Sequence, residues 1–368
     1  MKKILVCDYK QRHSQAIIWS LKKSGHKIIS FSEDNNIDFK LYGLDQIINK
    51  NYLSFKPNNL VTELNKMNCN IIIPVTINSF NYFSINKNIF ISNGFKLLIS
   101  DFKLWSMFHD KSKTFEFISK LNIPVPLTVN LSKHHYSNNI RDSKLNFPIV
   151  IKSTKEGGGR FVRYANNFHD VDLIIEDFLS MNNNLFEEGG VIAQDFINGN
   201  GCGYFALVDK GKIISKFGHL RIRESPPSGG ISTCCESFNH PKLMCYGDNI
   251  VTSSKFSGVV MIEFKYDKNS DEFYLIEINP KFWGSSLLSI ISGINFPLNY
   301  VKYLENQKLG KQKFISGLRL QFVFSDLKRV VKYRVGLINF FIDLVNPKVV
   351  KDFTFFGLYN FLKFNLKK

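Results

Sequence analysis

The sequence predicts an α/β (α+β) protein that begins with a doubly wound parallel sheet and continues with an antiparallel sheet. Strand-like and helix-like segments alternate about every 25 to 40 residues in the first part of the chain, as they do around parallel sheets. Several β-like runs then lie between residues 191 and 278, a pattern that favours antiparallel pairing. The last segment, 311–368, is rich in Phe and Lys and predicts a helical tail.

Residues 1–100 are expected to form the N-terminal α/β domain. Its elements are a buried strand at 3–7, a helix at 14–24 that ends at Gly25, a strand at 27–32, an amphipathic segment at 57–67 and a strand at 70–75. No GxGxxG motif follows the first strand, so a dinucleotide site is not indicated there.

Two further units and the tail are expected after residue 100. Residues 101–190 would form a small lid subdomain, with a helix at 103–121, a proline turn at 123–126, and strands at 147–152 and 160–164. Residues 191–310 would form a larger subdomain, with strands at 191–197, 203–208, 212–219, 258–266 and 273–278. Residues 311–368 would form the basic, Phe-rich tail, with a helix over 327–345.

Composition favours a cytoplasmic protein with an anionic partner. Lys and Arg number 48 against 31 Asp and Glu, a net charge of +17. No stretch approaches the roughly 18 to 20 apolar residues that span a bilayer, and the six cysteines show no CxxC spacing. The chain has no zinc-finger, RNP or homeodomain-like pattern, so we expect no nucleic-acid partner.

A glycine loop and two acidic strands carry the candidate chemistry. Gly157, Gly158 and Gly159 follow Lys152, and backbone N–H groups in such a loop can approach phosphate oxygens closely. An ordinary glycine-rich hairpin is the alternative.

The acidic strands predict a metal site. Glu263 and Glu277 lie on two apolar strands expected to pair, and Asn279 shares a face with Glu277 because side chains alternate along a strand. Three oxygen ligands of this kind suit Mg²⁺, whereas a salt-bridged acid pair is the other interpretation.

Together these motifs resemble the ATP-grasp superfamily, and the resemblance implies ATP and Mg²⁺, or Mn²⁺, as cofactors. Lys111 is similar to the first nucleotide lysine of the family and Lys152 to the second, with Gly157–Gly159 as the phosphate loop. The hinge that would hold adenine corresponds to Gln194, Asp195, Phe196 and Ile197. Glu263, Glu277 and Asn279 fall on the metal-ligand positions, in the E-x-N-P order of the family.

Four basic residues are the candidate catalytic groups: Arg221, Arg223, Lys281 and Arg319. Arg221 and Arg223 lie in a segment that resembles a narrower, mostly bacterial branch. Lys281 stands where the family usually carries Arg, and lysine keeps the charge but loses the planar fork. No carboxylate occurs from Lys281 to Gly293, which argues against the bicarbonate chemistry of biotin-dependent relatives.

The resemblance implies a ligase that activates a carboxylate as an acyl phosphate and joins it to an amine. An amino acid or an acidic sugar of a surface polysaccharide would be the substrate. A kinase that stops at the phosphorylated product and an idle nucleotide-binding module are the alternatives. For the tail, contact with the inner face of an anionic membrane, packing on the protein itself and pairing with a second copy all stay open.

Overall fold

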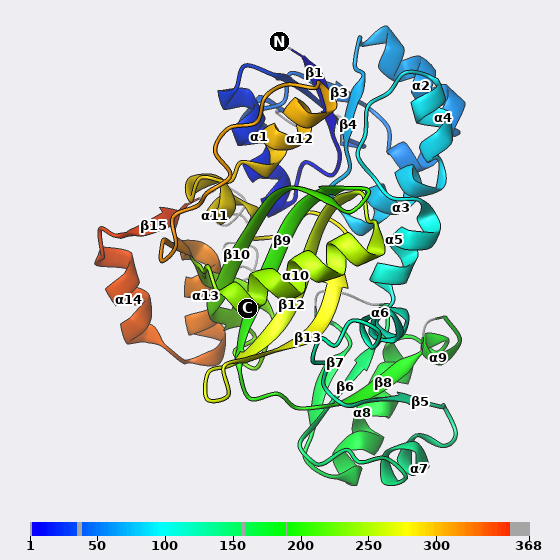
Figure 1. The fold of residues 1–368 in the computed structure, drawn as a ribbon, viewed down its shortest axis with the longest axis vertical. Coiled ribbons are helices and arrows are strands. Elements are labelled where there is room, and N and C mark those ends of the chain that lie inside the picture. The colour runs from blue at the N-terminus through cyan, green and yellow to red at the C-terminus, as the bar shows by residue number, and fades with distance from the viewer. Residues whose placement is uncertain (1, 35–38, 156–158, 189, 354–368) are drawn as a thin grey trace.

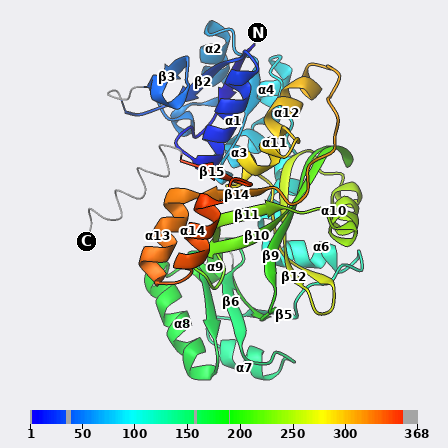
Figure 2. The same ribbon diagram turned by 90° about the vertical axis from the view of Figure 1, so that its left-hand side faces the viewer.

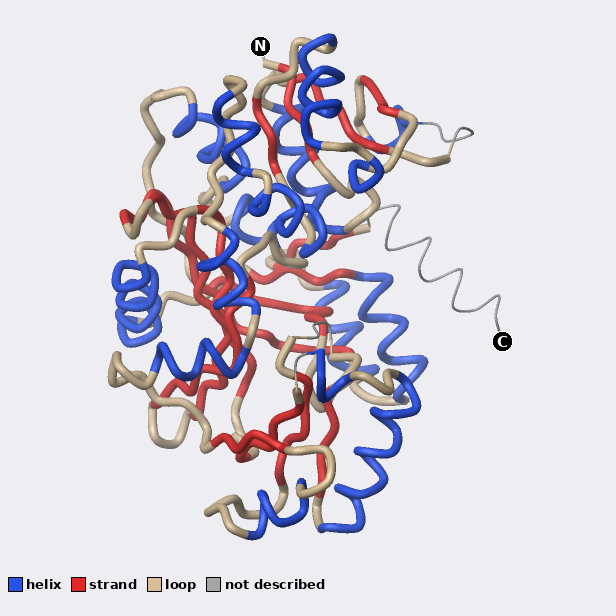
Figure 3. Tube along the Cα trace, turned by 90° about the vertical axis from the view of Figure 1, so that its right-hand side faces the viewer, coloured by secondary structure: helices blue, strands red, loops and turns tan. Residues whose placement is uncertain are grey.

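The structure is a computed structural model that describes residues 2–34, 39–155, 159–188 and 190–353. Three sheets organise these residues, and they take their strands from 3–73, 128–195 and 200–352 in turn (Figures 1 and 3). Gly157, Gly158 and the Phe-rich segment 354–368 lie outside the described residues.

The N-terminal sheet is parallel throughout, as predicted. Its strand order is β3-β2-β1-β4, with β1 (Lys3–Val6), β2 (Lys27–Phe31), β3 (Gln46–Ile48) and β4 (Ile71–Ile73). The chain also forms α1 (Arg12–Lys23), α2 (Pro57–Lys66), α3 (Ile77–Ile85), α4 (Lys87–Ser92) and two 3₁₀ turns, Phe39–Tyr42 and Tyr52–Ser54. The sequence analysis does not predict β3, which is three residues long and begins with an exposed Gln46.

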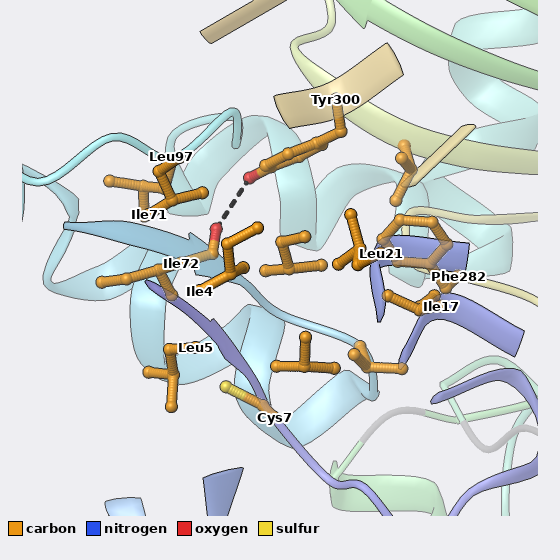
Figure 4. Packing of buried hydrophobic residues seen from close by; sticks show 14 of the residues in the cluster. Ile4, Leu5, Cys7, Ile17, Leu21, Ile71, Ile72, Leu97, Phe282 and Tyr300 are labelled. Atoms are coloured by element: carbon orange, nitrogen blue, oxygen red, sulfur yellow. Dashed lines mark hydrogen bonds between the residues drawn. The ribbon is translucent and has the colours of Figure 1, made fainter. Parts of the chain in front are cut away.

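A later part of the chain completes the core of this domain. The helix α12 (Phe296–Leu304) carries Tyr300, which is fully buried and donates from its hydroxyl to the carbonyl of Ile72 at 3.1 Å (Figure 4). Phe282 enters the same core beside Ile17 of α1 (Figure 4). The segment just after the acidic strands is therefore anchored against the N-terminal domain.

The small sheet is antiparallel, in the order β5-β8-β6-β7. Its strands are β5 (Thr128–Leu131), β6 (Ile149–Ser153), β7 (Val162–Ala165) and β8 (Val191–Asp195), and its helices are α7 (Tyr136–Arg141), α8 (Phe168–Met181) and α9 (Leu185–Glu188). The single helix expected at 103–121 is wrong: α5 (Phe102–His109) and α6 (Lys111–Ile118) flank Asp110. Asp110 has an extended backbone, and its side chain accepts from Ser112 and Lys113 as the N-cap of α6.

The large sheet has the order β13-β12-β9-β10-β11-β14-β15. Its strands are β9 (Asn200–Asp209), β10 (Lys212–Ser225), β11 (Ile231–Ser237), β12 (Gly258–Asp267), β13 (Glu272–Asn279), β14 (Arg319–Phe322) and β15 (Val349–Asp352). The helices α10 (Pro241–Ser254) and α11 (Ser286–Ile291) belong to the same part of the chain. All neighbouring strands pair antiparallel except β14 and β15.

The C-terminal segment is not a separate helical tail. Its strands β14 and β15 extend the large sheet, and α13 (Val323–Tyr333) and α14 (Leu337–Val345) lie between them (Figure 1). The continuous helix expected over 327–345 is wrong, because Arg334 and Gly336 adopt left-handed backbone conformations with φ of 53° and 70°, and such residues end helices. Within the described part of the chain, every helix is too short or too polar to cross a membrane.

Candidate active site

Two carboxylates face each other where β12 and β13 pair. Glu263 lies directly opposite Glu277 in the antiparallel register. The side-chain nitrogen of Asn279 donates to Glu277 at 2.7 Å and to Glu263 at 3.2 Å. Like charges opposite one another destabilise a sheet, so this group needs cations beside it.

Each carboxylate has its own cation. Lys111 begins α6, and its Nζ lies 3.2 Å from Glu277. Arg221 on β10 contacts Glu263 with one guanidinium nitrogen and donates to Glu224 with another at 2.8 Å. Gly201 on β9 leaves room for this arginine, since a Cβ there would lie 2.9 Å from Cδ of Arg221.

The two carboxylates differ in acidity. Burial raises the pKa of Glu263 to about 7, although Arg221 opposes this effect. Burial acts on Glu277 in the same direction, but Lys111, Asn279 and Lys152 outweigh it and lower the pKa of Glu277 to about 2. Near neutral pH, Glu277 is therefore fully ionised, whereas Glu263 is ionised only in part.

Lys152 joins this group from the small sheet. It lies on β6, is 3% exposed, and its Nζ donates to the carbonyl of Ile276 on β13 at 3.4 Å. Burial, assisted by the charge of Lys111, lowers the pKa of Lys152 to about 7. The two predicted nucleotide lysines and the two predicted metal carboxylates thus meet where the small and large sheets approach each other.

The predicted phosphate loop and hinge belong to the small sheet. Gly159 has φ of +76°, a conformation that favours glycine. Gln194 and Asp195 are the last two residues of β8, and the side chain of Gln194 donates to the hydroxyl of Thr128 at 2.7 Å. Phe196 and Ile197 follow β8, and the ring of Phe196 is 39% exposed. The backbone of this hinge is hydrogen-bonded to β5 and β6 through Gln194 and Asp195.

Lys281 lies near residues that the sequence did not indicate. It lies two residues after the end of β13 and, among the described residues, forms no ion pair and no side-chain hydrogen bond. Burial lowers its pKa, against the effect of Glu263 and Glu277. Burial together with Lys281 lowers the pKa of His13 on α1 to about 3. His13 and Lys281 are 268 residues apart in the sequence, so no local pattern could have indicated their proximity.

Arg223 and Arg319 belong to a different cluster. Arg223 donates to Asp326 of α13 at 2.8 Å and to Asp343 of α14 at 2.5 Å. Arg319 of β14 donates to Glu236 at 2.8 Å and to Asp343 at 3.1 Å. The register between β10 and β11 shifts on both sides of Arg223. Because of these shifts, Arg223 and Arg221 have different neighbours, although they are only two residues apart. The structure therefore places Arg223 and Arg319, two of the predicted catalytic residues, in this cluster and does not bring them to the paired carboxylates.

The chain is similar to known proteins both in sequence and in fold. Residues 218–324 match a family model described as ATP-grasp in the biosynthetic pathway with Ter operon. A carbamoyl-phosphate synthase of Methanobrevibacter smithii is 25% identical over 190 residues, which are 50% of this chain and 49% of that protein. The chain spans half or less of the length of the curated relatives that it matches.

Solved structures have a similar fold. A biotin carboxylase–β-γ-ATP complex from Campylobacter jejuni has a TM-score of 0.68 at 19% identity, covering 86% of this chain and 74% of that chain. An L-amino acid ligase from Bacillus licheniformis has a TM-score of 0.62 at 14% identity, covering 86% and 78%. At these identities the likeness concerns the fold. Residues 218–324 thus resemble the ATP-grasp family that this model describes, and the fold of the chain is similar to the folds of these solved structures.

Proposed function

We propose that this protein is an ATP- and Mg²⁺-dependent ligase that joins a carboxylate to an amine. The observation that carries the proposal is the convergence of Glu263, Glu277 and Asn279 with Lys111 and Lys152 at the approach of two sheets. Buried groups of both charges in one place suit a bound metal–phosphate unit, which itself carries both charges.

A divalent cation fits the carboxylate pair. The amide of Asn279 bridges Glu263 and Glu277, and turning this amide over would present its oxygen, so that all three residues would offer oxygen ligands. No cluster of three or more His, Cys, Asp or Glu side chains among the described residues could hold a metal, so phosphate oxygens and water would complete the six ligands of Mg²⁺. When bound, the cation would neutralise charge on the phosphates.

The lysines are suited to the nucleotide. Lys111 and Lys152 would bind its phosphates, and the resemblance implies that Gly157–Gly159 would add backbone N–H groups. The resemblance implies that the backbone of residues 194–197 would bind the adenine, and within this hinge Phe196 and Ile197 lie beyond the residues paired in β8. This assignment follows the resemblance residue by residue.

The reaction begins with attack of a substrate carboxylate oxygen on the γ-phosphorus of ATP. The bond from that phosphorus to the bridging oxygen of ADP breaks, and an acyl phosphate forms. An amine nitrogen then attacks the acyl carbon, phosphate leaves, and the nitrogen loses a proton. Lys281, which has no ion-pair partner among the described residues, is suited to holding the carboxylate, and Arg221 to stabilising the developing charge.

An acidic sugar or amino acid of a surface polysaccharide is the substrate that we propose. Such molecules carry the carboxylate or the amine that the reaction needs. The strong positive charge of the chain, +17, favours the approach of acidic substrates.

Product analysis tests the proposal against its alternatives. The full chain is incubated with Mg-ATP, pooled uronic acids and pooled amino acids, and ADP and phosphate are followed. Release of both that requires an acid and an amine supports the ligase. A stable phosphorylated product would instead identify a kinase, and ATP binding without turnover would identify an idle nucleotide-binding module.

A further inference from the structure

Helix α14 exposes a continuous apolar face, which we call the α14 face: Leu337, Ile338, Phe341, Ile342 and Val345. These positions recur at the spacing of one side of an α-helix. Their exposed fractions run from 51% for Phe341 to 75% for Ile338 and Val345. The opposite side of α14 is already occupied, because Phe340 and Asp343 are 3% and 2% exposed.

Helix α14 is thus inverted relative to an ordinary surface helix. Its single carboxylate, Asp343, is held inside by Arg223 and Arg319, while its apolar side chains face outward. The helix lies at the periphery of the molecule, beside α13 (Figures 1 and 2). A continuous exposed apolar face of this kind is typical of a site that contacts another protein or a membrane.

The exposed charged side chains in the segment that carries the α14 face are all positive. Within residues 319–353 the three carboxylates of Asp326, Asp343 and Asp352 are buried. Lys332, Arg334 and Lys348, in contrast, are exposed. An apolar face flanked along the chain by these three cations complements the acyl boundary and the phosphates of an anionic bilayer.

From this arrangement we infer that the α14 face binds the surface of an anionic lipid membrane. A second copy of the chain is the less suitable occupant, because a twofold contact would bring the same cations against each other. The chain's own residues 354–368 are less suitable for the same reason, since that sequence contains Lys363, Lys367 and Lys368 and no acid. The inference stands independently of the proposed ligase activity.

Flotation with vesicles tests the inference on the full chain. We expect binding to vesicles of equal parts phosphatidylcholine and phosphatidylglycerol, and little to phosphatidylcholine alone. The double variant Ile338→Asp/Phe341→Asp should lower the partition coefficient about tenfold or more. The matched control Leu53→Asp/Ile85→Asp changes two side chains that are 52% and 57% exposed elsewhere, and it should bind as the wild type does.

A second variant tests the charged rim and leaves the apolar face intact. Lys332→Gln/Lys348→Gln should lower the partition coefficient about thirtyfold at low salt, at roughly 1 kcal/mol per lysine, and should flatten the salt dependence. Thermal melting checks that each variant is folded.

Three outcomes would overturn the inference. The first is undiminished vesicle binding by Ile338→Asp/Phe341→Asp. The second is self-association that this variant abolishes, without vesicle binding by the wild type, which would identify a second copy as the occupant. The third is binding that is lost on deletion of 354–368 but kept in both variants, which would assign the contact to that segment.

Discussion

Lys111 and Glu277 form a partly buried ion pair, with Nζ 3.2 Å from a carboxylate oxygen. The lysine begins a helix that precedes the small sheet, and the carboxylate lies on a strand of the large sheet. In the proposed function one binds phosphate and the other binds the metal. The ion pair therefore links the proposed phosphate-binding lysine to the proposed metal ligand, and these two residues come from different parts of the fold.

Substitution of Glu277 tests the proposed metal site. Glu277→Gln keeps the shape but removes the charge, so we expect ATP-dependent ADP release to fall about 100-fold or more, because the cation loses a ligand and Lys111 loses its partner. The control is Glu272→Gln on the same strand, where the side chain accepts from Tyr246. Unchanged turnover and unchanged Mg²⁺ dependence in Glu277→Gln would refute the assignment.

The lowered pKa of Lys152 predicts that nucleotide binding is accompanied by proton uptake. Burial lowers the pKa of Lys152 to about 7, so at pH 8 most of the free protein carries this lysine neutral. Phosphate beside it raises that pKa, and binding therefore takes up a proton. Affinity for ATP should fall as the pH rises above 7, by up to about tenfold per pH unit.

Calorimetry in two buffers of different ionisation enthalpy measures this proton uptake at pH 8. Glu263 contributes little there, because its pKa of about 7 leaves it mostly ionised. In Lys152→Arg the charge no longer titrates, so the uptake should vanish and the pH dependence should flatten. Lys103→Met, at an exposed position of α5, should behave as the wild type does.

The proximity of Glu263 and Glu277 could be predicted because both lie in one hairpin, where alternation and short spacing determine which side chains meet. The environment of Arg223 could not be predicted in this way. Its partners Asp326 and Asp343 come from helices about one hundred residues later, and no local pattern links them. The same holds for β14 and β15, whose short strands give little signal and join the sheet only through tertiary pairing.

Asp326 is expected to hold the C-terminal helices to the large sheet. It is fully buried and accepts from Arg223, Thr233, Gln321 and Arg329. Asp326→Asn would leave two buried guanidinium groups without this charge, and should lower the free energy of unfolding by about 3 kcal/mol or more.

Urea denaturation measures this loss, and pH provides a second check. Burial alone would raise the pKa of Asp326, but Arg223 outweighs it and lowers the value. The stabilisation is therefore present above the unfolded pKa, about 4, and is lost as the pH falls through the folded value, where variant and wild type should converge. Asp177→Asn removes an exposed ion pair with Arg163 and should cost less than about 1 kcal/mol. Equal stability of Asp326→Asn and wild type at neutral pH would contradict the expected role.

Gly247 allows α10 to pack closely on β9. A Cβ at this position would lie 2.2 Å from the ring of Tyr204, which is itself fully buried and donates to Asp248 at 2.8 Å. Gly247→Ala should therefore lower the free energy of unfolding by about 1 to 3 kcal/mol, although alanine is the better helix former by about 1 kcal/mol. Gly310→Ala, where a Cβ meets nothing within 4 Å, should be neutral or slightly stabilising. The same substitution should therefore lower the free energy of unfolding at Gly247 but not at Gly310. Denaturation curves of both variants decide whether packing or helix propensity dominates at Gly247.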